Sequence, residues 1–124
     1  MEGGKTEKIL YIQTSGPDRP ERLYSPFILG IAAAAMGVEA EIVFMIDGVK
    51  VVKKGEAEKI RLEAFPVLAE TMRQALDAGV RIYVCEQSTR LLGIPTGDFI
   101  EEAKMIGAAT LTDLSLEADA VVTF

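Results

Sequence analysis

The chain has 124 residues, of which 49% are hydrophobic and 26% are charged, and its formal net charge is −6. This length and composition predict a single globular domain over residues 1–124 and exclude a disordered chain. An acidic chain has no general attraction to nucleic acid, so we expect no nucleic-acid partner.

Histidine is absent from the chain, and cysteine occurs once, at Cys85. A single cysteine excludes an internal disulfide and favours a reducing, cytoplasmic setting. Without histidine the chain lacks the commonest metal ligand, and it cannot assemble Ser-His-Asp or Cys-His catalysis by itself. We therefore expect no metal and no cofactor.

The sequence predicts neither secretion nor membrane insertion. Residues 1–7 lack the apolar stretch of a signal peptide, and we expect them to form a flexible leader. The longest apolar segment, residues 27–38, is shorter than the roughly 20 residues that a membrane-spanning helix needs.

The first third of the chain alternates between an apolar run and a helical pattern. Residues 8–14, KILYIQT, are apolar almost throughout, which is typical of a strand buried on both faces. Glycine and two prolines make residues 15–21 a loop. Apolar side chains at helical spacing predict a helix from Leu23 to a stop at Gly37, and a second buried strand follows at residues 41–46.

Residues 49–63 fit no single element, because VKVV suits either a short strand or a loop. The segment also holds a basic cluster that glutamates interrupt, which is typical of a solvated surface rather than an anion site. The cluster consists of Lys50, Lys53, Lys54, Lys59 and Arg61.

The second half repeats the alternation of helix and strand. Pro66 is expected in the first turn of a helix that ends at Gly79. Asp98 with Glu101 predicts a capped short helix, and Thr110 with Asp113 repeats the pattern before the last helix. The other predicted elements are strands at residues 81–85, 104–106 and 118–124 and a short helix at residues 87–92.

Uniformly apolar strands that alternate with helices predict an α/β fold, a mainly parallel sheet of about five strands between two helical layers. Right-handed crossovers place all strand-to-helix loops at the carboxyl edge of such a sheet, where ligands bind. The residues expected to meet there are Thr14, Ser15, Gly16, Asp47, Gly48, Cys85, Gln87 and Gly107.

Cys85 lies where a strand passes into a helix, and this position permits two interpretations. The positive end of the helix favours a thiolate and hence a nucleophile. A lone cysteine is also among the most buried residue types and often behaves as a small hydrophobe. Asp47-Gly48 is likewise either a ligand-binding pair or an ordinary turn.

Most of the chain resembles the DsrE/DsrF-like family of small sulfur-relay proteins. The likeness lies in the order and spacing of several stretches rather than in one motif. They are KILYIQTSGPDRPERLYSPFILGIAAAAMGVEAEIVF, DGVKVVKKG, RIYVCEQSTRLLGIPTGDFIEEAKMIGAATLTDL and the closing ADAVVTF. The cysteine at the end of the third strand is the most specific element, although CEQST departs from the sulfur-relay subunits.

The resemblance implies a three-layer α/β/α domain that assembles as dimers, trimers or hexamers. It also implies that Cys85 accepts sulfane sulfur as a persulfide and hands it to a partner protein, a sulfurtransferase-like activity. This chemistry needs one thiolate and a partner's sulfur, with no metal and no histidine.

Two other functions stay open at the level of sequence: a module that binds a small ligand beside an inert Cys85, and an oligomeric scaffold. The run PFILGIAAAAMG holds more apolar side chains than one helix face needs. The surplus fits a subunit interface, or a helix that is buried on all sides within the monomer.

Overall fold

The computed structural model describes residues 6–124, so residues 1–5 of the predicted leader lie outside the described residues. One five-stranded sheet organises the chain, and its neighbouring strands are all parallel. The strands are β1 (Lys8–Gln13), β2 (Glu39–Phe44), β3 (Arg81–Cys85), β4 (Ala103–Ile106) and β5 (Ala120–Thr123). The α-helices are α1 (Ser25–Ala35), α2 (Leu68–Asp77), α3 (Glu86–Leu91) and α4 (Ala108–Glu117). Short 3₁₀ helices are η1 (Pro20–Arg22), η2 (Ile46–Val52), η3 (Ala57–Lys59) and η4 (Thr96–Asp98).

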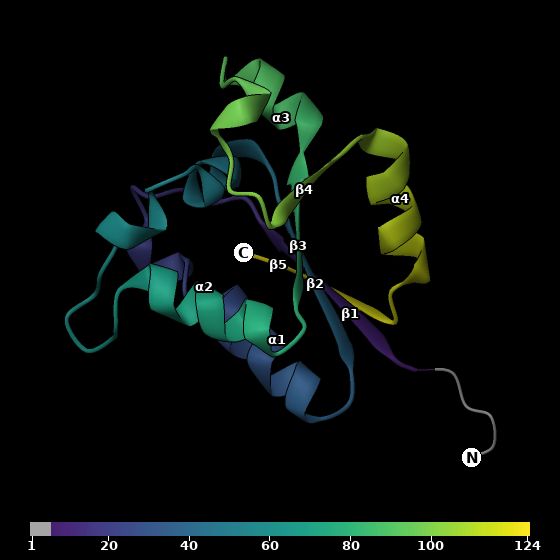
Figure 1. Ribbon diagram of the computed structural model, residues 1–124. Coiled ribbons are helices and arrows are strands. Elements are labelled where there is room, and N and C mark those ends of the chain that lie inside the picture. The colour runs from purple at the N-terminus through teal and green to yellow at the C-terminus, as the bar shows by residue number, and fades with distance from the viewer. Residues whose placement is uncertain (1–5) are drawn as a thin grey trace.

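The strand order β4-β3-β2-β1-β5 determines which face each helix covers. The chain steps in one direction from β1 to β4 and then returns across the sheet to place β5 beside β1. Right-handed crossovers put the connections of same-direction steps on one face and the returning helix on the other. Accordingly, α1 and α2 lie on one side of the sheet and α4 on the opposite side (Figure 1). The predicted three-layer fold is confirmed. In the described part of the chain, no helix has the length and apolar character needed to cross a membrane.

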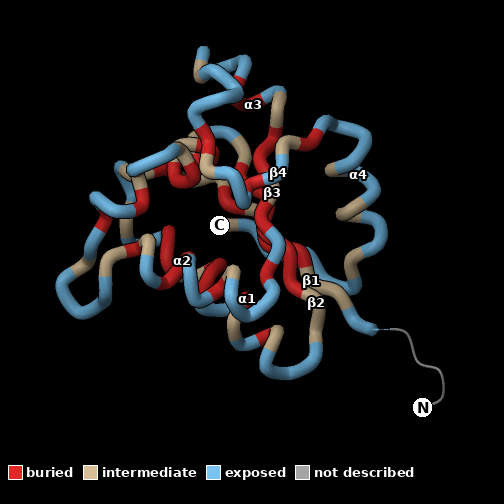
Figure 2. Tube along the Cα trace, viewed as in Figure 1, coloured by how far each residue is buried: buried red, intermediate tan, exposed pale blue. Residues whose placement is uncertain are grey.

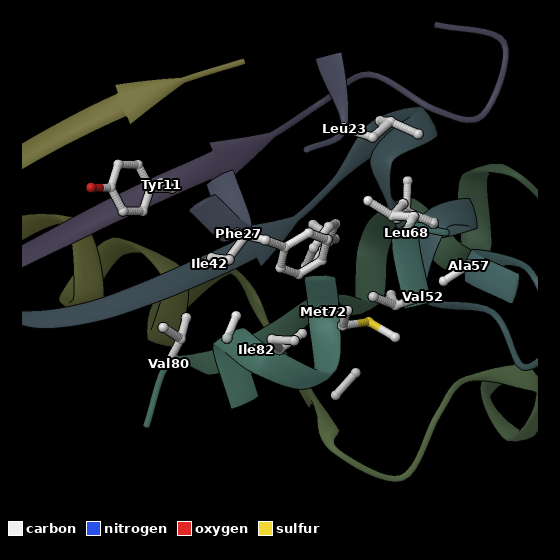
Figure 3. Packing of buried hydrophobic residues seen from close by; sticks show 14 of the residues in the cluster. Tyr11, Leu23, Phe27, Ile42, Val52, Ala57, Leu68, Met72, Val80 and Ile82 are labelled. Atoms are coloured by element: carbon white, nitrogen blue, oxygen red, sulfur yellow. The ribbon is translucent and has the colours of Figure 1, made fainter. Parts of the chain in front are cut away.

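The larger core lies between the sheet and the pair α1 and α2. Phe27 of α1 is fully buried, with its ring centroid 5.9 Å from that of Phe44 in β2. Leu68 and Met72 of α2 reach the same cluster, as Figure 3 shows. Burial of each such side chain contributes roughly 2 kcal/mol, so this layer supplies most of the hydrophobic stabilisation.

The opposite face of the sheet is covered more thinly. No residue of α4 is buried, and the helix appears in exposed and intermediate colours along its length (Figure 2). Its partly buried Leu111, Leu114 and Ala118 pack against a small cluster in the sheet. That cluster contains Leu10, Val43 and Ile106. Detaching α4 therefore costs less burial than detaching α1 or α2.

Several predicted boundaries need correction. The second strand is Glu39–Phe44 rather than residues 41–46, because the chain turns into η2 at Ile46. VKVV belongs to η2 and is neither strand nor loop, and this helix buries Val49, Val51 and Val52 completely. Pro66 precedes the N-cap residue of α2, Val67, instead of lying in the first turn.

Both predicted capping boxes are wrong. Asp98 ends η4, and its carbonyl accepts a hydrogen bond from the Lys54 N–H at 2.8 Å. Thr110 lies inside α4, which begins after Gly107 without a side-chain cap. In the first segment, the contact from Lys54 to Asp98 joins residues far apart in the sequence, so the local pattern did not decide it.

The loops after β1 and β2 pack closely because glycines lie between them. A Cβ atom on Gly16 would lie 2.8 Å from the Asp47 carbonyl oxygen. A Cβ atom on Gly48 would overlap the carbonyl oxygen of Gln13. Both neighbours are backbone atoms and cannot rotate away, so the two loops are locked together.

Gly48→Ala is therefore expected to lower the free energy of unfolding by about 3 kcal/mol, since backbone has to shift. Gly97→Ala is the matched control, because no atom lies within 4 Å of its added Cβ. Its effect should stay within about 0.5 kcal/mol. Urea denaturation of both variants measures the difference, and equal stabilities would contradict the close packing.

A polar pair lies on the α4 side of the sheet. The Tyr83 hydroxyl donates a hydrogen bond of 3.1 Å to the Glu41 carboxylate, whose side chain is only 9% exposed. Arg81 Nη1 lies 4.0 Å from the same carboxylate. Burial, followed by the negative charge of Glu41, raises the pKa of Tyr83 above its usual value.

Tyr83→Phe should cost about 1–2 kcal/mol at neutral pH, because the Glu41 carboxylate loses its donor. The folded pKa of Tyr83 is raised, so its contribution is complete below about pH 10, the free tyrosine value, and is lost as the pH rises through the raised pKa. The stability gap between wild type and variant should therefore narrow in urea unfolding near pH 11. A stability difference between wild type and Tyr83→Phe that stays constant with pH would contradict the hydrogen bond from Tyr83 to Glu41.

Candidate functional site

Cys85 is the last residue of β3, at the carboxyl edge of the sheet. It is aligned with Ile106, the last residue of the neighbouring strand β4. After β3 the chain turns toward the α1 and α2 side, where Phe99 joins the larger core. After β4 it turns to the other side and forms α4. Adjacent strands whose connections diverge leave a crevice between them, which is where α/β sheets bind ligands.

Side chains along a strand point to alternate faces of the sheet. Val84 faces the larger core and Tyr83 faces the α4 side, so Cys85, two residues after Tyr83, also lies on the α4 side. The residue is 8% exposed. Across the ladder, Ile106 is followed by the exposed Gly107, and nothing lies within 4 Å of a Cβ added there. The thiol is therefore almost fully covered, and the strand aligned with it leads through the open position of Gly107 into the thinly packed first turn of α4.

The ends of strands β1 and β2 carry the other predicted site residues. Thr14 donates from both its N–H and its hydroxyl to the Phe124 carbonyl, each at 2.8 Å, and so fastens the last strand to β1. The Ser15 carbonyl accepts a bond of 3.3 Å from Gln13 Nε2. Gly16 and Gly48 are buried in the close packing of the two loops. These contacts give four of the predicted ligand residues a structural role.

Asp47 and Gln87 are accessible. The Asp47 carboxylate lies 3.3 Å from Lys50 Nζ, and both side chains are about half exposed. Gln87 is exposed in the first turn of α3. The predicted site residues thus fall into two groups at one edge, the first at β1 and β2 and the second, with Cys85, Gln87 and Gly107, at β3 and β4.

A cavity of about 570 Å³ opens at this edge. Of its lining residues only Asp47 was predicted, and Cys85 does not line it. Lys50 and Lys53 belong to the basic cluster seen in the sequence, but the glutamates that interrupt this cluster indicated a solvated surface and not a binding site. The lining residues are Pro17, Asp18, Asp47, Lys50, Lys53, Glu56, Leu92 and Ile94.

Ile46 adopts a backbone conformation that β-branched residues rarely take, with φ of 56°. Its N–H donates a bond of 2.8 Å to the hydroxyl of Ser88, which is almost fully buried in α3. Such strain persists only where the surroundings enforce it, and it is common near functional sites. No sequence pattern predicted either residue. Among residues 6–124, no group of three or more acidic or cysteine side chains is arranged to hold a metal ion.

Comparison with solved structures supports the fold. The protein YchN from E. coli superimposes with a TM-score of 0.77 at 20% sequence identity, covering 97% of this chain and 100% of that one. MTH1491 from Methanobacterium thermoautotrophicum, a protein of unknown function, gives a TM-score of 0.68 at 18% identity, with the same coverage. At these identities the likeness shows the fold alone.

Sequence comparison identifies relatives in Methanocaldococcus jannaschii. The uncharacterized protein MJ0760 is 34% identical over 106 residues, which is 86% of this chain, and this chain spans 38% of its length. The uncharacterized protein MJ0989 is 31% identical over 117 residues, 94% of this chain and 99% of its own length. The model of the DsrE/DsrF-like family matches residues 7–124. The chain therefore belongs to the DsrE/DsrF-like family.

Proposed function

We propose that the protein is a sulfur carrier, sulfurtransferase-like in its chemistry, that accepts sulfane sulfur on Cys85 and passes it to a partner protein. The family is associated with sulfur relay in general. The observation that carries the proposal is the position of the one cysteine, at the crevice where the connections of β3 and β4 diverge. A reducing, cytoplasmic setting suits this chemistry.

The transfer step balances without metal or added oxidant. The Cys85 thiolate attacks the outer sulfur of a donor persulfide, a new S–S bond forms at Cys85, and the donor's S–S bond breaks. The donor leaves as a thiolate, so no net oxidation occurs. An acceptor thiolate then takes the outer sulfur in the same way. Because the chain has no second cysteine, donor and acceptor sulfurs both come from partners.

The thin cover of the α4 face gives such partners a route to the thiol. Cys85 is 8% exposed, so a donor reaches it only if its surroundings move slightly. Regions with few buried contacts open locally at a lower free energy than the whole fold. The first turn of α4 is such a region, since Ala108, Ala109 and Thr110 are all exposed.

Folded wild-type protein exposed to a low-molecular-weight persulfide should gain about 32 Da, one sulfur atom, in intact-mass analysis. Cys85→Ser should gain nothing, and dithiothreitol should reverse the adduct. An adduct that forms only after the protein is unfolded in urea would exclude the carrier function.

The cavity beside Asp47 and Lys53 supports a second candidate, a binding module in which Cys85 is inert. Its volume lies within the range of small-molecule sites, about 300–1,000 Å³. The two functions are distinguished in one variant: Cys85→Ser abolishes sulfur uptake but leaves ligand binding in this cavity intact.

We infer that the protein assembles as a homo-oligomer (a dimer, trimer or hexamer) through α1 and the edge strand β5. All four residues of β5 are exposed, and its outer side has no partner strand in the described chain. Val122 is aligned with Tyr11, whose hydroxyl donates to the Leu29 carbonyl of α1. Leu29 and Val122 are thus both linked to Tyr11, and both are exposed, as is Ile28 on the same helix. Exposed apolar patches on an unprotected edge are typical of interfaces.

The double variant Leu29→Asp with Val122→Asp should convert the oligomer into the 13.4 kDa monomer in light scattering, because like charges would be buried in the contact. Leu116→Asp on α4 is the matched control, since Leu116 is 79% exposed and lies on the other face. A monomeric wild type, or dissociation by the control alone, would reject this interface.

A further inference from the structure

The cavity at the carboxyl edge is built from three separate segments of the chain. The loop after β1 contributes Pro17 and Asp18, and the segment after α3 contributes Leu92 and Ile94. Residues 47–56, which include most of η2, supply the remaining wall. Because Cys85 is not part of the lining, sulfur transfer does not account for this cavity.

The three segments are held together by hydrogen bonds and close packing, so the cavity is formed before any ligand arrives. Ser88 of α3 accepts the N–H of Ile46 at 2.8 Å, which ties α3 to the start of η2. The Lys54 N–H bonds to the Asp98 carbonyl at 2.8 Å. Gly16 packs against the backbone of Asp47 and joins the first loop to the same wall. A preformed site loses little conformational entropy on binding.

The walls of the cavity differ in chemistry. Pro17, Leu92 and Ile94 make an aliphatic wall. Lys50 and Asp47 largely neutralise each other at 3.3 Å. Among residues 6–124, the side chains of Lys53, Asp18 and Glu56 have no oppositely charged side chain within 4.0 Å. The cavity thus offers one free cation and two free anions beside an apolar surface.

This combination selects a class of ligand. A simple anion such as phosphate would meet three carboxylates, and a simple cation would meet two lysines. A zwitterion places each of its charges beside an opposite one. An aliphatic portion on the same molecule would cover Leu92 and Ile94 and displace water from them.

We propose that this cavity binds a free α-amino acid with an apolar side chain. Its carboxylate would pair with Lys53, its ammonium group with Asp18 or Glu56, and its side chain would contact Leu92 and Ile94. This binding is independent of Cys85 and does not rest on the sulfur-carrier function.

The first test uses the wild-type protein. Titration with L-leucine to about 20 mM, followed by amide chemical shifts in NMR, should give saturable changes at the cavity residues with a Kd below about 1 mM. The same titration with 4-methylpentanoate, which lacks the ammonium group, and with isoamylamine, which lacks the carboxylate, should give at least tenfold weaker binding (~tenfold per lost charge pair). Absence of saturable shifts, or equal binding of either analogue, would overturn the proposal.

Variants then test which charged side chains of the cavity pair with the ligand. Lys53→Met and the double variant Asp18→Asn with Glu56→Gln should each weaken L-leucine binding about tenfold or more. The matched controls Lys59→Met and Glu58→Gln alter exposed residues outside the cavity lining and should bind as wild type does. Cys85→Ser should also bind normally, so loss of sulfur uptake and loss of ligand binding are distinguishable. Unchanged affinity in both cavity variants would contradict the proposed pairing.

Discussion

A crossover between parallel strands is right-handed, and this chain reverses its direction across the sheet once, between β4 and β5. That reversal sends α4 alone to one face while α1 and α2 share the other. It also makes the connections after β3 and β4 leave the sheet on opposite sides. Cys85 and Ile106, aligned at the ends of these two strands, border the crevice that results. The position of the thiol thus follows from the handedness of the chain.

The two faces of the sheet differ in how firmly they are covered. The α1 and α2 side contains Phe27, Leu68 and most of the buried apolar side chains, whereas no residue of α4 is buried. Local opening therefore requires the least free energy on the face of the sheet where Cys85 lies. At the end of the strand order, all four residues of the edge strand β5 are exposed.

The strands and their parallel arrangement were predictable because each is an apolar run, and such runs are read directly from residue types. The approximate position of Cys85 followed from them. The cavity was not predictable. Val49, Val51 and Val52 fit a strand as well as the 3₁₀ helix that buries them, so the pattern did not show that η2 turns Lys50 into a pocket. Nor did it mark Ile46, whose strained backbone depends on Ser88, 42 residues away in the sequence. The missed features depend on contacts between distant segments.

The carboxyl edge therefore carries two separate candidate sites, a thiol beside β4 and a preformed cavity beside η2. The central claim is that Cys85 becomes accessible by local motion while the fold stays intact. The rate of its alkylation by iodoacetamide under native conditions tests this most directly, when compared with the rate of global unfolding of the same protein. The account predicts that alkylation is much faster than unfolding and is insensitive to low urea. Alkylation that proceeds only as fast as the whole protein unfolds would contradict it.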